Sequence, residues 1–115
     1  MRWSELVKAL DATVLVPGGD FHIRNVAAAD LLSDILACEK EEFVILTGQV
    51  TSPAIRTALA VGALGVVVVR GKRVPEETID LSASYGIPLA VTDAMMFEAS
   101  VTLGGILWSS PTSKS

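Results

Sequence analysis

The chain has 115 residues, half of them hydrophobic and 19% charged, with a net charge of −4. This length predicts one domain, and the apolar content is too high for a disordered chain. The negative net charge argues against a general nucleic-acid binder, because such proteins neutralise phosphates with an excess of Lys and Arg.

Three features indicate the compartment. Cys38 is the only cysteine, so the chain can form neither an intrachain disulfide nor a metal site of paired thiolates. The first ten residues lack the continuous apolar run of a signal peptide. The longest uncharged stretch, residues 57–69, is shorter than the ~20 residues that a membrane-spanning helix needs. We therefore expect a cytoplasmic protein that makes no use of a membrane.

The N-terminal quarter predicts one helix and two strands. Apolar residues recur at helical spacing over residues 3–10, with Ser4 as the expected N-cap. Residues 12–16 are rich in β-branched side chains, and residues 21–26 alternate between apolar and polar. The turn sequence Pro-Gly-Gly-Asp separates the two. These patterns predict a hairpin or a looser antiparallel strand pair after the first helix.

Residues 27–42 are expected to form a helix, because Leu31, Leu32, Ile35 and Leu36 would share one face. Asp34 stands inside this apolar run. Its carboxylate either caps the helix or faces solvent, or it approaches the edge of a sheet.

A regular strand–helix alternation begins at residue 43. Three short, continuous apolar runs, residues 43–47, 65–69 and 87–91, each precede a helical segment. Such runs are typical of parallel strands that helices cover on both faces. Ser52-Pro53, Pro75 and Asp93 are expected to open the three helices, whereas Gly65 and Gly86 stand where helices end and strands begin.

We therefore predict a single α/β domain over residues 1–108, with a mixed or parallel sheet. Its β-α-β-α-β-α core spans residues 43–107, and a helix and a strand pair precede it. Residues 109–115 are small and polar, and we expect them to form a disordered tail.

The loops after the three core strands hold the candidate binding residues. In parallel sheets, ligands collect at the carboxyl ends of the strands, where helix N-termini favour anions. Two interpretations fit these loops: a phosphate or carboxylate site, or helix caps beside a solvated edge. Neither GxxxxGK[ST] nor GxGxxG occurs in the chain. The candidate ligand-binding residues are Thr47, Gly48, Gln49, Arg70, Gly71, Lys72, Thr92 and Asp93.

The sequence offers no catalytic constellation. His22 is the only histidine, and no GxSxG motif accompanies it. Cys38 lies beside Glu39, and an acidic neighbour disfavours a thiolate, so we interpret Cys38 as a packing residue. His22, Cys38 and the carboxylates lack the close spacing of a metal site. We therefore predict no catalytic residue, no metal and no cofactor.

The C-terminal segment suggests self-association. Leu103, Ile106, Leu107 and Trp108 recur at helical spacing around Gly104-Gly105. The two glycines permit close helix packing, either within the domain or across a dimer contact. We expect a homodimer.

Residues 66–100, "VVVVRGKRVPEETIDLSASYGIPLAVTDAMMFEAS", resemble the pattern of DRTGG domains and of the related N-terminal domain of HPr kinase/phosphorylase. "DLLSDILA" (30–37) and "FVILTGQ" (43–49) look like the first half of small stand-alone DRTGG-like proteins. The likeness covers residues 1–107. The string Asp-Arg-Thr-Gly-Gly itself is absent, and the loop after the first core strand has the sequence Thr-Gly-Gln-Val-Thr-Ser.

The resemblance implies an α/β domain that accompanies catalytic or CBS-type sensor domains and is regulatory. It implies no kinase activity, because the phosphate-binding loop of HPr kinase belongs to a C-terminal domain that this sequence lacks. The expected function is a non-catalytic module that binds a small anionic ligand, such as a nucleotide, at the carboxyl edge. The alternative is a protein–protein interaction or dimerisation module that docks a catalytic subunit. An enzyme with Asp34, Asp93 or His22 as acid or base is disfavoured, because no two titratable groups have a suitable spacing.

Overall fold

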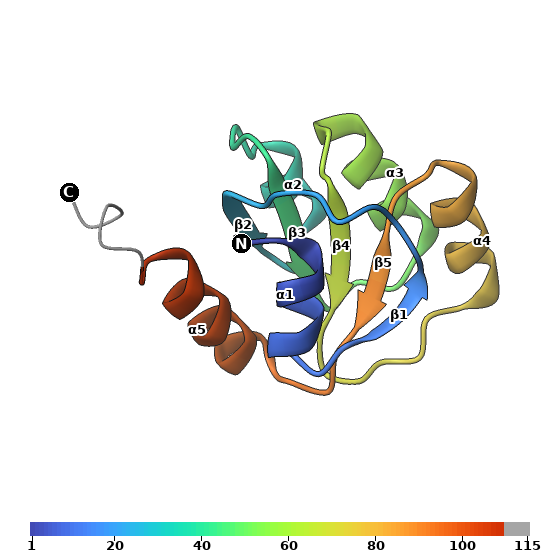
Figure 1. The fold of residues 1–115 in the computed structure, drawn as a ribbon. Coiled ribbons are helices and arrows are strands. Elements are labelled where there is room, and N and C mark those ends of the chain that lie inside the picture. Colours follow the sequence, from blue (N-terminus) through green and yellow to red (C-terminus); the bar gives the residue numbers. More distant parts are fainter. Residues whose placement is uncertain (110–115) are drawn as a thin grey trace.

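The computed structural model describes residues 1–109, which form one α/β domain around a five-stranded mixed sheet (Figure 1). None of the described helices is long and apolar enough to cross a membrane. In chain order the elements are α1 (Trp3–Ala9), β1 (Thr13–Val16), β2 (Asn25–Ala28), α2 (Leu32–Leu36), β3 (Phe43–Thr47), α3 (Ser52–Val61), β4 (Gly65–Val68), α4 (Glu76–Ser84), β5 (Leu89–Val91) and α5 (Met96–Leu107).

The strand order is β1-β5-β4-β3-β2. Strands β2 to β5 are parallel, and β1 joins β5 as an antiparallel edge strand. The predicted β-α-β-α-β-α core over residues 43–107 is confirmed as β3-α3-β4-α4-β5-α5. All four parallel strands therefore present their carboxyl ends at one edge of the sheet, at the bottom of Figure 1.

The sheet separates two hydrophobic cores. Alternate residues of each strand point to opposite faces, so Ile45 and Val66 pack on one side, whereas Val44 and Val67 pack on the other. Helices α2, α3 and α4 cover the first face, and α1 and α5 cover the second (Figure 1). Every residue of β3 and β4 is buried, which explains why these strands have continuous apolar sequences.

The predicted pairing of residues 12–16 with residues 21–26 is wrong. Strands β1 and β2 lie at opposite edges of the sheet, and β2 pairs in parallel with β3. The alternating residues 21–23 pair instead with the N-terminus, where the amide of Trp3 donates to Phe21 O at 3.0 Å and the amide of Ile23 donates to Met1 O at 2.6 Å. The Trp3 and Phe21 rings stack with centroids 5.2 Å apart. The alternation of apolar and polar residues thus predicted an extended backbone correctly, but it did not predict which segment pairs with that backbone.

Helix α2 is much shorter than the predicted helix over residues 27–42. Residues 27 and 28 belong to β2, and the helix is confined to Leu32–Leu36. The residues from Leu31 to Leu36 have the expected helical spacing, but the preceding alanines extend the sheet because β3 offers them a parallel partner.

Several predicted helix ends shift. Helix α1 begins before Ser4, whose amide donates to the Asp20 carboxylate at 2.9 Å, so a distant aspartate caps this helix. Helix α3 ends at Val61 with Gly62 rather than Gly65 as its C-cap, although Gly65 opens β4 as expected. Helix α5 starts at Met96 rather than directly after Asp93. The structure describes Ser109, but the rest of the predicted disordered tail lies outside the described residues.

A stability prediction follows from Thr92, which joins the end of β5 to the end of α1. Its buried hydroxyl donates to Leu10 O at 2.7 Å and accepts from the Ala94 amide at 3.2 Å. Thr92→Val keeps the shape but leaves both backbone groups without this partner, so we expect the free energy of unfolding to fall by about 1–3 kcal/mol.

Urea denaturation measures this loss. Thr13→Val, at an exposed position of β1, is the matched control and should change stability by less than about 0.5 kcal/mol. Equal effects at the two positions would show that the Thr92 hydrogen bonds contribute nothing.

Candidate functional site

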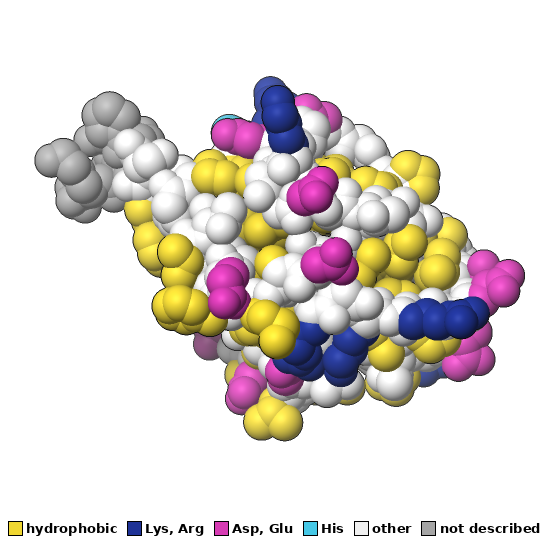
Figure 2. Space-filling model, turned by 90° about the horizontal axis from the view of Figure 1, so that it is seen from below, with side chains coloured by type: hydrophobic (Ala, Val, Ile, Leu, Met, Phe, Trp, Pro, Cys, Tyr) yellow, Lys and Arg dark blue, Asp and Glu magenta, His cyan; other side chains and the backbone are white. Residues whose placement is uncertain are grey.

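The candidate site lies at the carboxyl edge of the sheet, which faces the viewer in Figure 2. Lys and Arg side chains lie there among hydrophobic and acidic ones. Each parallel strand contributes a loop to this edge because the parallel register aligns the strand ends. The loops start at Ala29 after β2, at Gly48 after β3, at Val69 after β4 and at Thr92 after β5.

The centre of the site is a carboxylate that the sequence did not point to. Asp30 follows β2, and its Oδ1 accepts a hydrogen bond from the Gly48 amide at 2.7 Å. Its Oδ2 lies 3.5 Å from Nη1 of Arg70, and its backbone oxygen accepts from Nε2 of Gln49 at 2.7 Å. Nζ of Lys72 donates to Gly48 O at 3.0 Å. Three strand ends therefore meet in one hydrogen-bonded cluster, which we call the Asp30 cluster: Asp30, Gly48, Gln49, Arg70 and Lys72.

The turn after β4 has an unusual backbone. Arg70 and Gly71 are consecutive left-handed residues, with φ of 66° and 57°. The Arg70 amide donates to Ala94 O and the Gly71 amide to Thr92 O, each at 2.8 Å. A side chain at Gly71 would have to displace the Asp93 carboxylate and would be strained by the left-handed backbone, which favours glycine there. This turn holds the Arg70 guanidinium over Gly48, where a Cβ would overlap it.

The remaining predicted residues have other positions. The Thr47 and Thr92 side chains are fully buried, and the Thr47 hydroxyl accepts from the Gln49 amide at 3.1 Å. Both hydroxyls thus fix the loop backbones. Asp93 is exposed beside Gly71. Of the eight predicted residues, the structure brings four into the Asp30 cluster: Gly48, Gln49, Arg70 and Lys72.

The Asp30 cluster stabilises the charged form of the Asp30 carboxylate. The pKa of Asp30 lies below the ordinary value of 3.8, chiefly because the Gly48 amide donates a hydrogen bond to its carboxylate. Partial burial opposes this effect, whereas the charges of Arg70 and Lys72 add to it. The Arg70 and Asp30 side chains remain 32% and 48% exposed, so their ion pair contributes less than about 1 kcal/mol. The Asp30–Arg70 pair is therefore a partly exposed ion pair rather than a buried salt bridge.

The sequence pattern does not single out Asp30, because helical spacing assigns residues 27–42 to one helix. The alternative position of Asp34 at the edge is not found, since Asp34 is exposed on α2. One signal in the sequence could have found Asp30. Residues 26–29 are a short apolar run followed directly by this aspartate, as expected for a strand that ends at the carboxyl edge.

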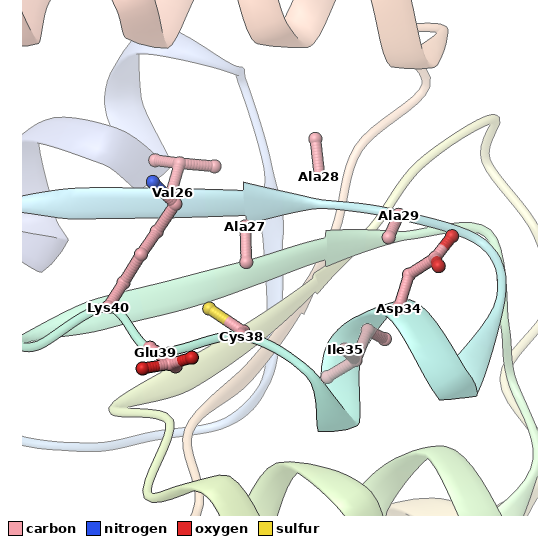
Figure 3. Close-up of a pocket in the computed structure, with 9 residues that line it drawn as sticks. All are labelled: Val26, Ala27, Ala28, Ala29, Asp34, Ile35, Cys38, Glu39 and Lys40. Atoms are coloured by element: carbon pink, nitrogen blue, oxygen red, sulfur yellow. The ribbon is translucent and has the colours of Figure 1, made fainter.

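A hollow lies between β2 and α2, apart from the Asp30 cluster (Figure 3). Its volume is about 550 Å³, and the small side chains of β2 leave it open. Cys38 points its sulfur toward β2 and packs against the core, as predicted for a packing residue (Figure 3). The hollow is lined by Val26, Ala27, Ala28, Ala29, Asp34, Ile35, Cys38, Glu39 and Lys40.

Over residues 1–109, no group of three or more His, Cys, Asp or Glu side chains could hold a metal ion. His22 is exposed and lies in an isolated antiparallel β-bridge with Arg2.

Comparison with known proteins supports the fold. No family model matches the sequence, and no curated protein matches it. The structure is similar to the CBS and DRTGG domains of the regulatory region of Clostridium perfringens pyrophosphatase, which was crystallised with its activator diadenosine tetraphosphate. The TM-score is 0.71 at 16% identity, and the match covers 97% of this chain and 48% of that one. The chain therefore has a fold like that of the CBS and DRTGG region and spans about half of its length.

The lowered pKa of Asp30 predicts a pH-dependent contribution to stability. A carboxyl with a folded pKa below 3.8 stabilises the fold above that pH, and the contribution is lost as the pH falls through the folded value. Asp30→Asn should therefore lower the melting temperature at about pH 6, and the gap from the parent protein should close as the pH falls below 3.8.

Thermal melts across this range measure the gap, with Asp80→Asn on the exposed surface of α4 as the matched substitution. A gap that stays constant or widens on acidification would contradict the assigned role of Asp30.

Proposed function

We propose that this chain is a non-catalytic regulatory module that binds a small anionic ligand, such as a nucleotide, at the carboxyl edge of its sheet. The observation that supports this most directly is the Asp30 carboxylate, which the Gly48 amide and the Arg70 guanidinium already hold there. The edge thus contains donors arranged around a negatively charged group of the chain itself.

A ligand phosphate would use the same donors. The Arg70 guanidinium matches the geometry of phosphate oxygens, and Lys72 adds a second positive charge beside it. Asp30 then acts as an internal competitor, because its carboxylate takes the Gly48 amide and repels a second anion. Ligand binding would require Asp30 to release this amide or to share Arg70.

The other predicted ligand-binding residues have secondary roles in this proposal. Asp93, exposed beside Gly71, supplies an acceptor for the hydroxyl groups of a sugar. Gln49 is tied to Asp30, so movement of Asp30 would free its amide group. Thr47 and Thr92 hold the loops in place.

The structural neighbour supports a regulatory role, because it is the regulatory region of an enzyme and was crystallised with a nucleotide activator. On this basis we propose membership of the DRTGG family and action on a catalytic partner protein. The relation to HPr kinase/phosphorylase and the cytoplasmic location stay predictions from the sequence.

Thermal-shift titrations test the proposed site. ATP, ADP, diadenosine tetraphosphate and inorganic phosphate should be titrated to millimolar concentrations, and at least one nucleotide should raise the melting temperature progressively. Arg70→Ala and Lys72→Ala should each weaken the apparent affinity about tenfold, because each removes a charge-assisted hydrogen bond. Arg73→Ala is the matched control, since this exposed cation is adjacent in sequence but not part of the Asp30 cluster.

Asp30→Asn should act in the opposite direction and tighten nucleotide binding, because it removes the competing charge. No shift with any of these anions at millimolar concentration, or equal losses in the Arg70, Lys72 and Arg73 variants, would refute the proposal.

A further inference from the structure

Strand β2 has an open outer edge. It is the last strand of the sheet and pairs with β3 on its inner side. The Ala29 amide at its end donates to Leu46 O of β3 at 3.0 Å. Because backbone groups alternate in direction along a strand, the N–H and C=O groups of Val26 and Ala28 point away from β3. Among residues 1–109, no other segment pairs with them. Such a row of unpaired donors and acceptors is matched by the backbone of another extended chain.

This edge lies between two hollows on opposite faces of the sheet. The hollow between β2 and α2, about 550 Å³ in volume, is the α2 hollow, and a hollow of about 230 Å³ between β2 and α5 is the α5 hollow. Val26 and Ala28 border both. Figure 3 shows these two side chains directed to one side of β2 and Ala27 to the other, and Val26 and Ala27 accordingly pack with the cores on opposite faces. An added strand would send its side chains alternately into the two hollows in the same way.

The side chains of β2 leave this edge accessible. Residues 27–29 are all alanine, so no bulky side chain covers the backbone there. The exposed Lys40 lines both hollows, and in Figure 3 its side chain runs across β2 toward Val26. Lysines at sheet edges oppose indiscriminate pairing, because an incoming chain without a carboxylate must bury or displace the charge. Lys40 thus favours an acidic segment over a neutral one.

The charges along the edge select one arrangement of such a segment. Arg24 and Lys40 line the α5 hollow, whereas no carboxylate is among the described residues around it. Nε of Arg24 lies 4.0 Å from Oε2 of Glu42, and both side chains are more than half exposed, so this pairing is weak. Asp34 lies near the other end of β2 (Figure 3). An acidic side chain is therefore complementary to the Val26 end of the edge.

We propose that the outer edge of β2 binds an extended segment of a partner protein as a sixth, antiparallel strand of the sheet. The segment has, in chain order, a small residue opposite Ala28, a large apolar residue opposite Ala27 and an acidic residue opposite Val26. The first and third residues exchange backbone hydrogen bonds with Ala28 and Val26.

Each side chain of this segment has its own place. Directly opposite residues of antiparallel strands direct their side chains to the same face. The apolar side chain therefore enters the α2 hollow beside Ala27, Ile35 and Cys38, and the acidic one meets Arg24 and Lys40 on the α5 side. The inference does not rest on the proposed anion site, because no residue of the Asp30 cluster lines either hollow.

Fluorescence anisotropy with synthetic peptides tests the proposal. The probe is a fluorescein-labelled peptide with blocked ends, Thr-Val-Ser-Leu-Glu-Val-Thr, which should bind the 115-residue chain saturably with a Kd below about 1 mM. N-methylation of the peptide's glutamate removes an amide that donates to Val26 O, so the affinity should fall at least about fivefold. N-methylation of its leucine is the matched control, because that amide points away from β2, and the affinity should change less than about twofold.

Variants of β2 test the same contact from the protein's side. Ala28→Pro removes the outward N–H but leaves the bonds between β2 and β3, so it should weaken peptide binding at least about tenfold. Ala28→Ser keeps the N–H and should bind within about twofold of the parent protein.

A charge exchange gives a result that a folding defect cannot imitate. Lys40→Glu should weaken the glutamate peptide at least about threefold and tighten the peptide that has lysine in place of glutamate. The same change of affinity for both peptides would contradict the placement of the acidic residue.

Three results would overturn the proposed strand addition. The first is no saturable binding of the probe up to about 1 mM, and the second is an equal loss of affinity with the two N-methylated peptides. The third is a parent protein that sediments as a dimer and that Ala28→Pro converts to a monomer, because a second copy of the chain would then occupy the edge.

Discussion

Burial of β3 and β4 on both faces is the constraint on which the rest of the structure depends. Every side chain in these strands is buried, so neither face of the central sheet can carry polar chemistry. Charged and hydrogen-bonding groups are displaced to the strand ends, where the loops reach water. The Asp30 cluster is the direct result, since three adjacent parallel strands end at the same level.

The strand–helix alternation after residue 43 was predictable because several local signals agreed: continuous apolar strands, prolines near helix starts and glycines near helix ends. The N-terminal part was not, because alternation over residues 21–26 identifies extended chain without specifying its neighbour. Met1 and Trp3 provide that neighbour for residues 21–23, and β3 pairs with residues 25–28. Both contacts depend on tertiary structure that no local pattern encodes.

The candidate site was predictable in place but not in composition. The rule that loops after parallel strands share one edge places Gly48, Gln49, Arg70 and Lys72 correctly. Asp30 can be placed there only once β2 is known to pair in parallel with β3. Similarly, the residues expected to mediate self-association included Leu103, which packs inward, whereas Phe97 and Val101 form the exposed surface together with Trp108. Helical spacing gives the faces of α5 but not which face meets the sheet.

We propose that the carboxyl edge binds an anion through the donors that now hold Asp30. The most direct measurement is a ¹H–¹⁵N correlation spectrum of the labelled protein titrated with the nucleotide that stabilises it most. We expect the largest and saturable shifts at the amides of Gly48, Gln49 and Arg70 to Lys72. Shifts confined to the hollow between β2 and α2, or to the exposed side of α5 with Phe97, Val101 and Trp108, would contradict this proposal.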